Sequence, residues 1–138
     1  MTEFFNQFNK GAADGAADTL LFMSYDLAVW DGKQPADDRE AGATHLHLYE
    51  QYIEADENIP PIPKIISFVE MLVKLWPDVD TDDDSPWAAT PIISEARGPY
   101  IYFTMSWSRA DEVLPCAAEI AEQLGLICFD PQLGRMRP

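Results

Sequence analysis

The sequence predicts one domain that combines α-helices and β-strands, of the α/β class in the broad sense and of the α+β type. We expect a mixed sheet of about four strands with the helices on one face. Residues 24–30 and 100–107 alternate between apolar and polar side chains, which is typical of half-buried strands. Three other stretches repeat apolar residues at helical spacing. The predicted order is β-α-α-β-β-α-β, and 138 residues fit a single domain.

The first strand is predicted at 24–30, and a helix should follow it from about Pro35 to Tyr52. Proline suits the first turn of a helix, and acidic residues just after it complement the positive end of the helix dipole. The buried stripe of this helix should consist of Ala41, Leu46, Tyr49 and Ile53.

A second helix is predicted from about Pro63 to Trp76, after a proline-rich linker at 58–63. Ile65, Val69 and Leu72 lie on its apolar stripe, and Pro77 ends it.

The second half of the chain should contain a short strand at 92–96 and a long one at 100–107. Ser108 is the expected N-cap of a third helix, which includes Pro115 and ends at Gly125. A last strand is predicted at 126–129, followed by an irregular tail.

Removing one helix from the first crossover leaves β-α-β-β-α-β, so the architecture is expected to be related to the ferredoxin-like sandwich. Residues 1–22, with two tandem Gly-Ala-Ala-Asp tetrapeptides, are interpreted as an N-terminal extension that is either docked or frayed. The domain proper is expected to span 23–138.

The chain is strongly acidic, with 24 acidic and 9 basic residues and a formal net charge of −15. Direct nucleic-acid binding is excluded because Lys and Arg do not cluster beyond Arg135 and Arg137, so nothing would neutralise phosphates. An anionic membrane surface is disfavoured for the same reason. A field of this sign attracts a metal ion, another cation or a basic protein.

Cys116 and Cys128 each lie in an apolar stretch, which favours core positions in a reducing compartment over a disulfide or redox pair. No run approaches the ~18 apolar residues of a transmembrane helix. The N-terminus lacks the cationic and apolar regions of a secretory signal. A cytoplasmic location is therefore expected.

An acidic loop after Pro77 is the main candidate for function. Its aspartates begin like a calcium loop, but the sixth position is Asp83 instead of glycine and the twelfth is Ala89 instead of glutamate. The loop is interpreted either as a solvated segment kept flexible by self-repulsion or as a docking surface for Lys and Arg of a partner. The predicted contact residues are Asp78, Asp80, Asp82, Asp83, Asp84 and Trp87.

Trp87 is either an interface anchor with a charged rim or a core residue. A second acidic patch is predicted at Glu54, Asp56 and Glu57. Together with the loop, it would form one extended negative surface.

No residues are predicted to perform catalysis or to hold a cofactor. His45 and His47 point in different directions on a helix, so they should not share a metal. No Gly-x-Ser-x-Gly elbow or Gly-rich phosphate loop occurs. Tyr100, Tyr102 and Thr104 share one strand face, either as the lining of a polar groove or as ordinary half-exposed residues.

Several segments resemble a group of small bacterial proteins that is common in actinomycetes. The matching pieces are MSYDLAVW at 23–30, PPIPKIISFVEMLVKLWPD at 60–78, DSPWA at 84–88, GPYIYFTMSWSRADEV at 98–113 and GLICFDPQ at 125–132. Proteins similar to this group are suspected of being immunity proteins, which neutralise toxins delivered between bacteria. The resemblance implies such a role and supplies no catalytic residues.

The leading hypothesis is thus an immunity-type inhibitor, not an enzyme, that binds a basic, nuclease-like toxin domain. One alternative is a metal-dependent enzyme that uses the carboxylates of Asp78–Asp84. Another is a small-molecule sensor or adaptor that uses the tyrosine face of the sheet.

Overall fold

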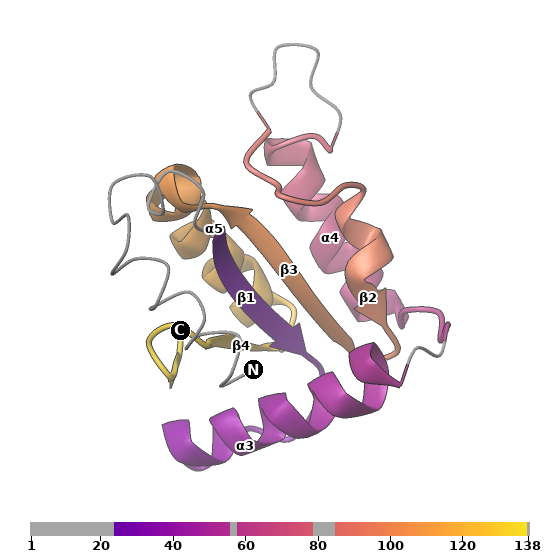
Figure 1. The fold of residues 1–138 in the computed structure, drawn as a ribbon, viewed down its shortest axis with the longest axis vertical. Helices are drawn as coiled ribbons and strands as arrows, with labels where there is room; N and C mark the ends of the chain where they lie inside the picture. The colour runs from indigo at the N-terminus through magenta and orange to yellow at the C-terminus, as the bar shows by residue number, and fades with distance from the viewer. Residues whose placement is uncertain (1–23, 56–57, 79–84, 138) are drawn as a thin grey trace, which may run out of the picture.

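The structure is a computed structural model that describes residues 24–55, 58–78 and 85–137. It is an α+β fold with a five-stranded antiparallel sheet and, in the described residues, three α-helices (Figure 1). The elements are β1 (Ser24–Trp30), α3 (Asp38–Tyr49), α4 (Pro63–Leu75), β2 (Ala96–Arg97), β3 (Tyr100–Ser106), α5 (Ala110–Gln123), β4 (Ile127–Asp130) and β5 (Arg135–Met136). Short helical turns lie at η1 (Glu50–Glu54), η2 (Ile92–Glu95) and η3 (Trp107–Arg109). The predicted extension at 1–22 lies outside the described residues.

The strand order is β2-β3-β1-β4-β5. β1 and β3 form the centre and pair along seven residues, from Ser24 opposite Ser106 to Trp30 opposite Tyr100. β4 pairs with the other edge of β1, and the two-residue strands β2 and β5 lie outside β3 and β4. All pairs are antiparallel, so the predicted mixed sheet is wrong.

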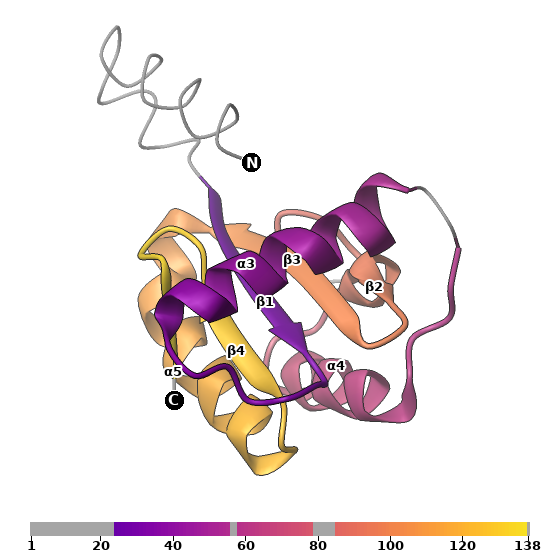
Figure 2. The same cartoon turned by 90° about the horizontal axis from the view of Figure 1, so that it is seen from below.

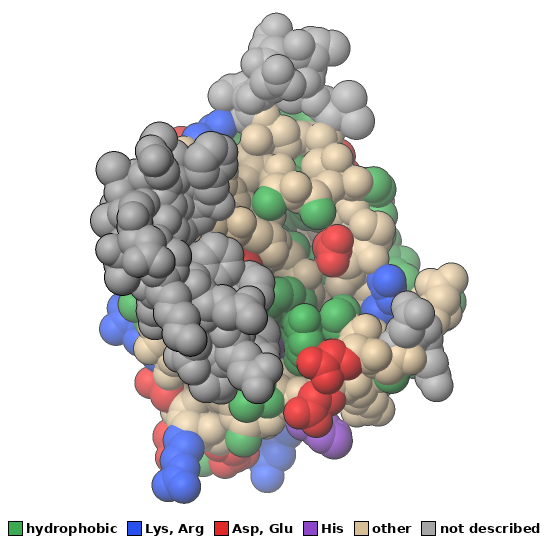
Figure 3. Space-filling model, in the orientation of Figure 1, with side chains coloured by type: hydrophobic (Ala, Val, Ile, Leu, Met, Phe, Trp, Pro, Cys, Tyr) green, Lys and Arg blue, Asp and Glu red, His purple; other side chains and the backbone are tan. Residues whose placement is uncertain are grey.

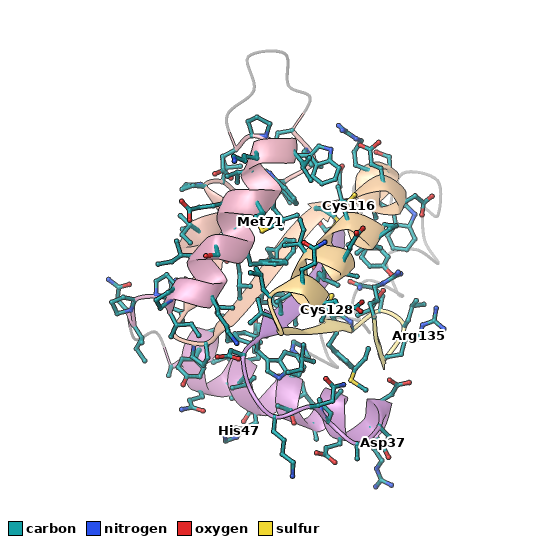
Figure 4. The ribbon with its side chains drawn as sticks, turned by 180° about the vertical axis from the view of Figure 1, so that it is seen from behind. Asp37, His47, Met71, Cys116, Cys128 and Arg135 are labelled. Carbon is teal, nitrogen blue, oxygen red and sulfur yellow. The ribbon has the colours of Figure 1, made fainter. Side chains whose placement is uncertain are left out.

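Alternation along the strands produces two apolar layers. Leu27 and Val29 of β1 and Phe103 of β3 point to one face, where they pack against α4 and α5 in the larger core. Trp30 and Tyr100 point to the other face, toward α3. Figure 2 shows α3 crossing one face of the sheet, and Figure 4 shows α4 and α5 on the opposite face.

The prediction that all helices share one face is therefore wrong for α3. The reason is that Trp30, Tyr100 and Phe129 form an aromatic surface on the second face. A helix that covers such an aromatic surface removes it from water and so stabilises the folded state. α3 supplies that cover at its Ala41 and His45 positions.

The start and the buried stripe of α3 also differ from the prediction. The helix begins at Asp38, and the carboxylate of the N-cap Asp37 accepts the backbone N–H of Glu40 at 2.8 Å. Leu46, expected inside, is 43 % exposed, whereas His45 is buried.

Two predicted boundaries in the second half are wrong as well. Residues 92–95 form a 3-10 turn, and only Ala96–Arg97 pairs with β3. Ser108 is not an N-cap, because a 3-10 turn at Trp107–Arg109 leads into α5 without a side-chain cap. α5 continues through the exposed Pro115, and the tail predicted as irregular contains β5.

Candidate functional site

The predicted acidic contact set is described only in part. Asp56, Glu57, Asp80, Asp82, Asp83 and Asp84 lie outside the described residues. Asp78 is half-buried, and its carboxylate accepts the backbone N–H of Ile92 at 2.9 Å. This bond holds the start of the acidic loop against η2, so Asp78 has a structural role whether or not it meets a partner.

Trp87 lies in the core. Its side chain is 7 % exposed and its indole N–H donates to the backbone carbonyl of Trp76 at 2.7 Å. The ring packs edge-on against those of Trp76 and Phe103, with centroids 6.3 and 5.9 Å away. Of the two interpretations, the core position describes Trp87, and in this conformation the ring does not offer an exposed anchor.

Of the acidic residues in the two predicted patches, the structure describes Glu54 and Asp78. Glu54 ends η1, before the linker to α4, whereas Asp78 follows the end of α4. With 13 residues at 1.5 Å each, α4 separates its own two ends by about 20 Å. Figure 1 shows the two segments at opposite ends of this helix. Glu54 and Asp78, the described acidic residues of the two predicted patches, therefore do not lie side by side.

Exposed carboxylates occur on several other elements. Within the described ranges, ion pairs of 4 Å or less involve only three carboxylates: Asp31 with Lys64, Glu112 with Arg109 and Asp130 with Arg137. The space-filling view in Figure 3 shows acidic side chains over α3, with basic side chains near them. The surplus of negative charge is therefore largely uncompensated by ion pairing inside the described chain.

A buried polar cluster lies on the α3 face of the sheet. The Asp26 carboxylate accepts the Tyr102 hydroxyl at 2.6 Å and the Thr104 hydroxyl at 3.0 Å. Burial raises the pKa of Asp26, although both hydrogen bonds oppose the shift. Burial and the neighbouring Asp26 charge raise the pKa of Tyr102. Sequence alternation placed Tyr102 and Thr104 on one face but did not single out Asp26.

His45 joins this face from α3. Its Nδ1 lies 3.0 Å from the Tyr100 hydroxyl, and rings of Trp30, Tyr102 and Phe129 surround it at 5.5–6.5 Å between centroids. Burial lowers the pKa of His45 to about 4, so the ring is neutral at pH 7. Its Nε2 is buried and has no hydrogen-bond partner in the described part of the chain. His47 is exposed, which confirms that the two histidines do not converge.

A second buried network centres on Asp130, at the end of β4. The fully buried carboxylate accepts the Tyr25 hydroxyl at 2.5 Å and the Arg137 Nε at 2.8 Å. Backbone N–H groups of Gln132 and Leu133 also donate to it. Gln132, Leu133 and Arg137 follow Asp130 closely in the chain, whereas Tyr25 comes from β1 at the other end of the domain.

The Gln132 side chain links the two networks. Its amide donates to the Asp26 carbonyl at 2.8 Å and accepts the Asp26 N–H at 2.6 Å, as a neighbouring strand would. Its amide also donates to the Asp130 carboxylate at 2.9 Å. The buried polar groups of both networks thus largely satisfy one another, which is the pattern of structural networks.

An open groove lies between the start of α3, the end of α5 and β4–β5. Its volume is about 520 Å³, within the ~300–1,000 Å³ of ordinary ligand sites. Figure 4 shows this side, with Cys128, Arg135 and Asp37 around it. The lining consists of Gln34, Asp38, Glu122, Gly125, Leu126, Ile127, Cys128, Met136 and Arg137.

The described residues contain no group of three or more His, Cys, Asp or Glu side chains that could hold a metal ion. Cys128 is buried in the core, as predicted, and burial raises the pKa of its thiol to about 12. Cys116 is half-buried on α5, and both thiols are free. No helix in the described ranges has the length and apolar character needed to cross a membrane.

Comparison with known proteins adds no relative. No family model, curated protein or solved structure matches this chain.

Proposed function

We propose that this protein is an acidic, non-catalytic binding module that captures and blocks a cationic protein. The specific proposal is an immunity-type inhibitor of a basic, nuclease-like toxin domain. The observation that carries it is a net charge of −15, with few of the described carboxylates engaged in ion pairs. Long-range attraction by such a charge speeds encounter with a basic partner and disfavours acidic ones.

The arrangement of the buried polar groups supports the same proposal. The Asp26 and Asp130 carboxylates are buried, but their side-chain partners belong to the same domain. Groups held in this way stabilise a scaffold and leave the surface charges to make contacts. The resemblance to bacterial proteins suspected of immunity roles favours the toxin domain among basic partners.

The test is co-expression of the full chain with the basic domain encoded by a neighbouring gene. The expected result is that the chain restores growth of cells that produce the toxic domain, and that the two proteins co-purify. Because exposed charges are screened by salt, the complex should weaken strongly between low and high ionic strength. Growth inhibition that continues despite the chain, together with no complex at low salt, would contradict the proposal.

Calorimetry distinguishes the proposed binding module from the alternative, a metal-dependent enzyme. Titration of the full chain with Ca²⁺, Mg²⁺ and Mn²⁺ should give no micromolar affinity. Micromolar binding would favour an enzyme built on the carboxylates of 78–84.

We also propose that the fold is related to the ferredoxin-like sandwich. The order β2-β3-β1-β4 and the placement of α4 and α5 on one face support this relation. α3 and β5 would then be additions to the shared core.

A further inference from the structure

We infer that the groove between α3, α5 and the β4–β5 edge receives a lysine or arginine side chain of the cationic partner. This inference rests on the proposed function and assigns part of the contact to a place that the acidic-loop prediction does not include. The shape of the groove, its charge and the end of α5 that opens onto it all favour a cationic side chain.

The shape suits a long side chain with a charged tip. Leu126 and Ile127 are 6 % and 5 % exposed and, with Met136, form an apolar wall. Asp38 and Glu122 lie at the groove on α3 and α5, and both are exposed. Lys and Arg side chains lay their methylene stems along apolar surface and keep the charged group in a polar, wet position.

The charge of the groove favours a cation. Arg137 lines it, but its Nε is paired with the buried Asp130 carboxylate at 2.8 Å. Lys64 lies near Gly125 at the end of α5 and is paired with Asp31 at 3.6 Å. With both basic groups paired, the carboxylates of Asp38 and Glu122 remain as the uncompensated charges.

The end of α5 adds an independent argument. A helix C-terminus carries partial negative charge and is normally complemented by a basic residue in its last turn. The last turn of α5 has no basic residue and instead contains Glu122. The Lys64 ammonium lies near Gly125 but is paired with Asp31, so a cation supplied by a partner would add to the positive charge at this end of the helix.

Asp38 is held in a fixed position. Its Oδ1 accepts the backbone N–H of Met136 at 3.0 Å, which ties the start of α3 to β5 across the groove. Asp38→Asn keeps an oxygen for this bond and removes the charge. Glu122→Gln removes a charge at an exposed position of α5, so both variants are expected to fold.

The test is an NMR titration of the ¹⁵N-labelled full chain with the peptide acetyl-Ala-Lys-Ala-amide. The same peptide with an Nε-acetylated lysine serves as the neutral probe. We expect the charged peptide to shift amides at 125–128 and 136–137 specifically, and the neutral peptide to leave them unchanged. Asp38→Asn and Glu122→Gln should each weaken binding by up to about fivefold, the upper end for an exposed ion pair.

Glu70→Gln is the matched control, because Glu70 is exposed on α4, whose buried side faces the other core. It changes the net charge equally and should leave the affinity at the groove nearly unchanged. The inference is overturned if the peptide shifts amides over all acidic surfaces and Glu70→Gln weakens the peptide affinity as much as the groove variants do. It is also overturned by an absence of shifts at 125–128 in peptide excess.

The two proposals can fail separately. If the Asp38→Asn/Glu122→Gln double variant protects cells as well as the natural chain does, the groove is not the contact but the inhibitor function stands. If the peptide binds in the groove but no toxin is neutralised, the groove binds cations and the proposed function is wrong.

Discussion

Asp130→Ala should destabilise the protein by about 3 kcal/mol. The substitution leaves the Arg137 guanidinium and the Tyr25 hydroxyl without their acceptor, and two backbone N–H groups lose theirs. Breaking a buried ion pair costs about 3–5 kcal/mol. The lower end applies here because the Arg137 side chain is 24 % exposed and water can partly replace the lost carboxylate.

Urea unfolding at equilibrium, followed by tryptophan fluorescence, measures this change. Asp130→Asn keeps one oxygen for the backbone N–H groups and should cost clearly less than alanine. Glu70→Ala, at an exposed site on α4, should stay within about 0.5 kcal/mol of the natural protein. A loss of less than about 1 kcal/mol for Asp130→Ala, or equal losses for alanine and asparagine, would refute the reasoning.

Three further predictions concern other described contacts. Because the pKa of His45 is lowered to about 4 in the folded state and is near 6.5 when unfolded, stability should fall as pH drops through this window, by about 2 kcal/mol between pH 7 and 5. His45→Gln, measured by urea unfolding at both pH values, should lose that part of the dependence; an equal dependence would contradict the assignment. Gly125→Ala should cost about 1–2 kcal/mol because φ is +74°. Gly42→Ala lies inside α3, where the added methyl would meet the Phe129 ring at 3.5 Å, an ordinary contact, so it should be neutral or stabilising by up to about 1 kcal/mol. Thermal unfolding of the two variants checks both signs. Trp87→Phe should cost about 1–3 kcal/mol through the lost bond to the Trp76 carbonyl, and a stability equal to that of the natural chain would show that the indole is not a core donor.

Periodicity was sufficient to predict the centre of this fold. Alternation predicts both strands, and Leu27, Val29 and Phe103 share the face that packs against α4 and α5 because a strand has a period of two. The prediction that β1 is half-buried is wrong, since α3 buries its other face as well. α4 was also predicted closely, since Pro63 begins it and its apolar stripe is continuous. These elements depend on local pattern, which a single sequence contains.

The elements that were predicted wrongly depend on contacts between residues far apart in the sequence. α3 covers an aromatic surface that three strands build together, and no window of sequence shows that surface. The isoleucines at 92 and 93 have high strand propensity, yet the Asp78 carboxylate and the Pro91 carbonyl fix this segment as a 3-10 turn. Tertiary hydrogen bonds outweigh propensity at such places.

The sequence predicts the negative charge of the protein, but it does not predict where the groove lies. Composition predicts a cationic partner, and this stays a prediction. The groove, however, combines residues from 34–38, 122–128 and 136–137, which only the sheet order brings together. Trp87 stood beside carboxylates in the sequence but packs inward, because its neighbours in space are Trp76 and Phe103.

The unequal environments of the two thiols give the molecule a built-in attachment point for reporter groups. Maleimide dyes react with the thiolate, and the thiol of Cys128 is buried and has a pKa raised to about 12. Cys116 is the more accessible of the pair and lies on α5, the helix whose far end borders the groove. A single fluorophore can therefore be placed on the natural chain without mutagenesis, and its emission can follow the arrival of a partner in real time.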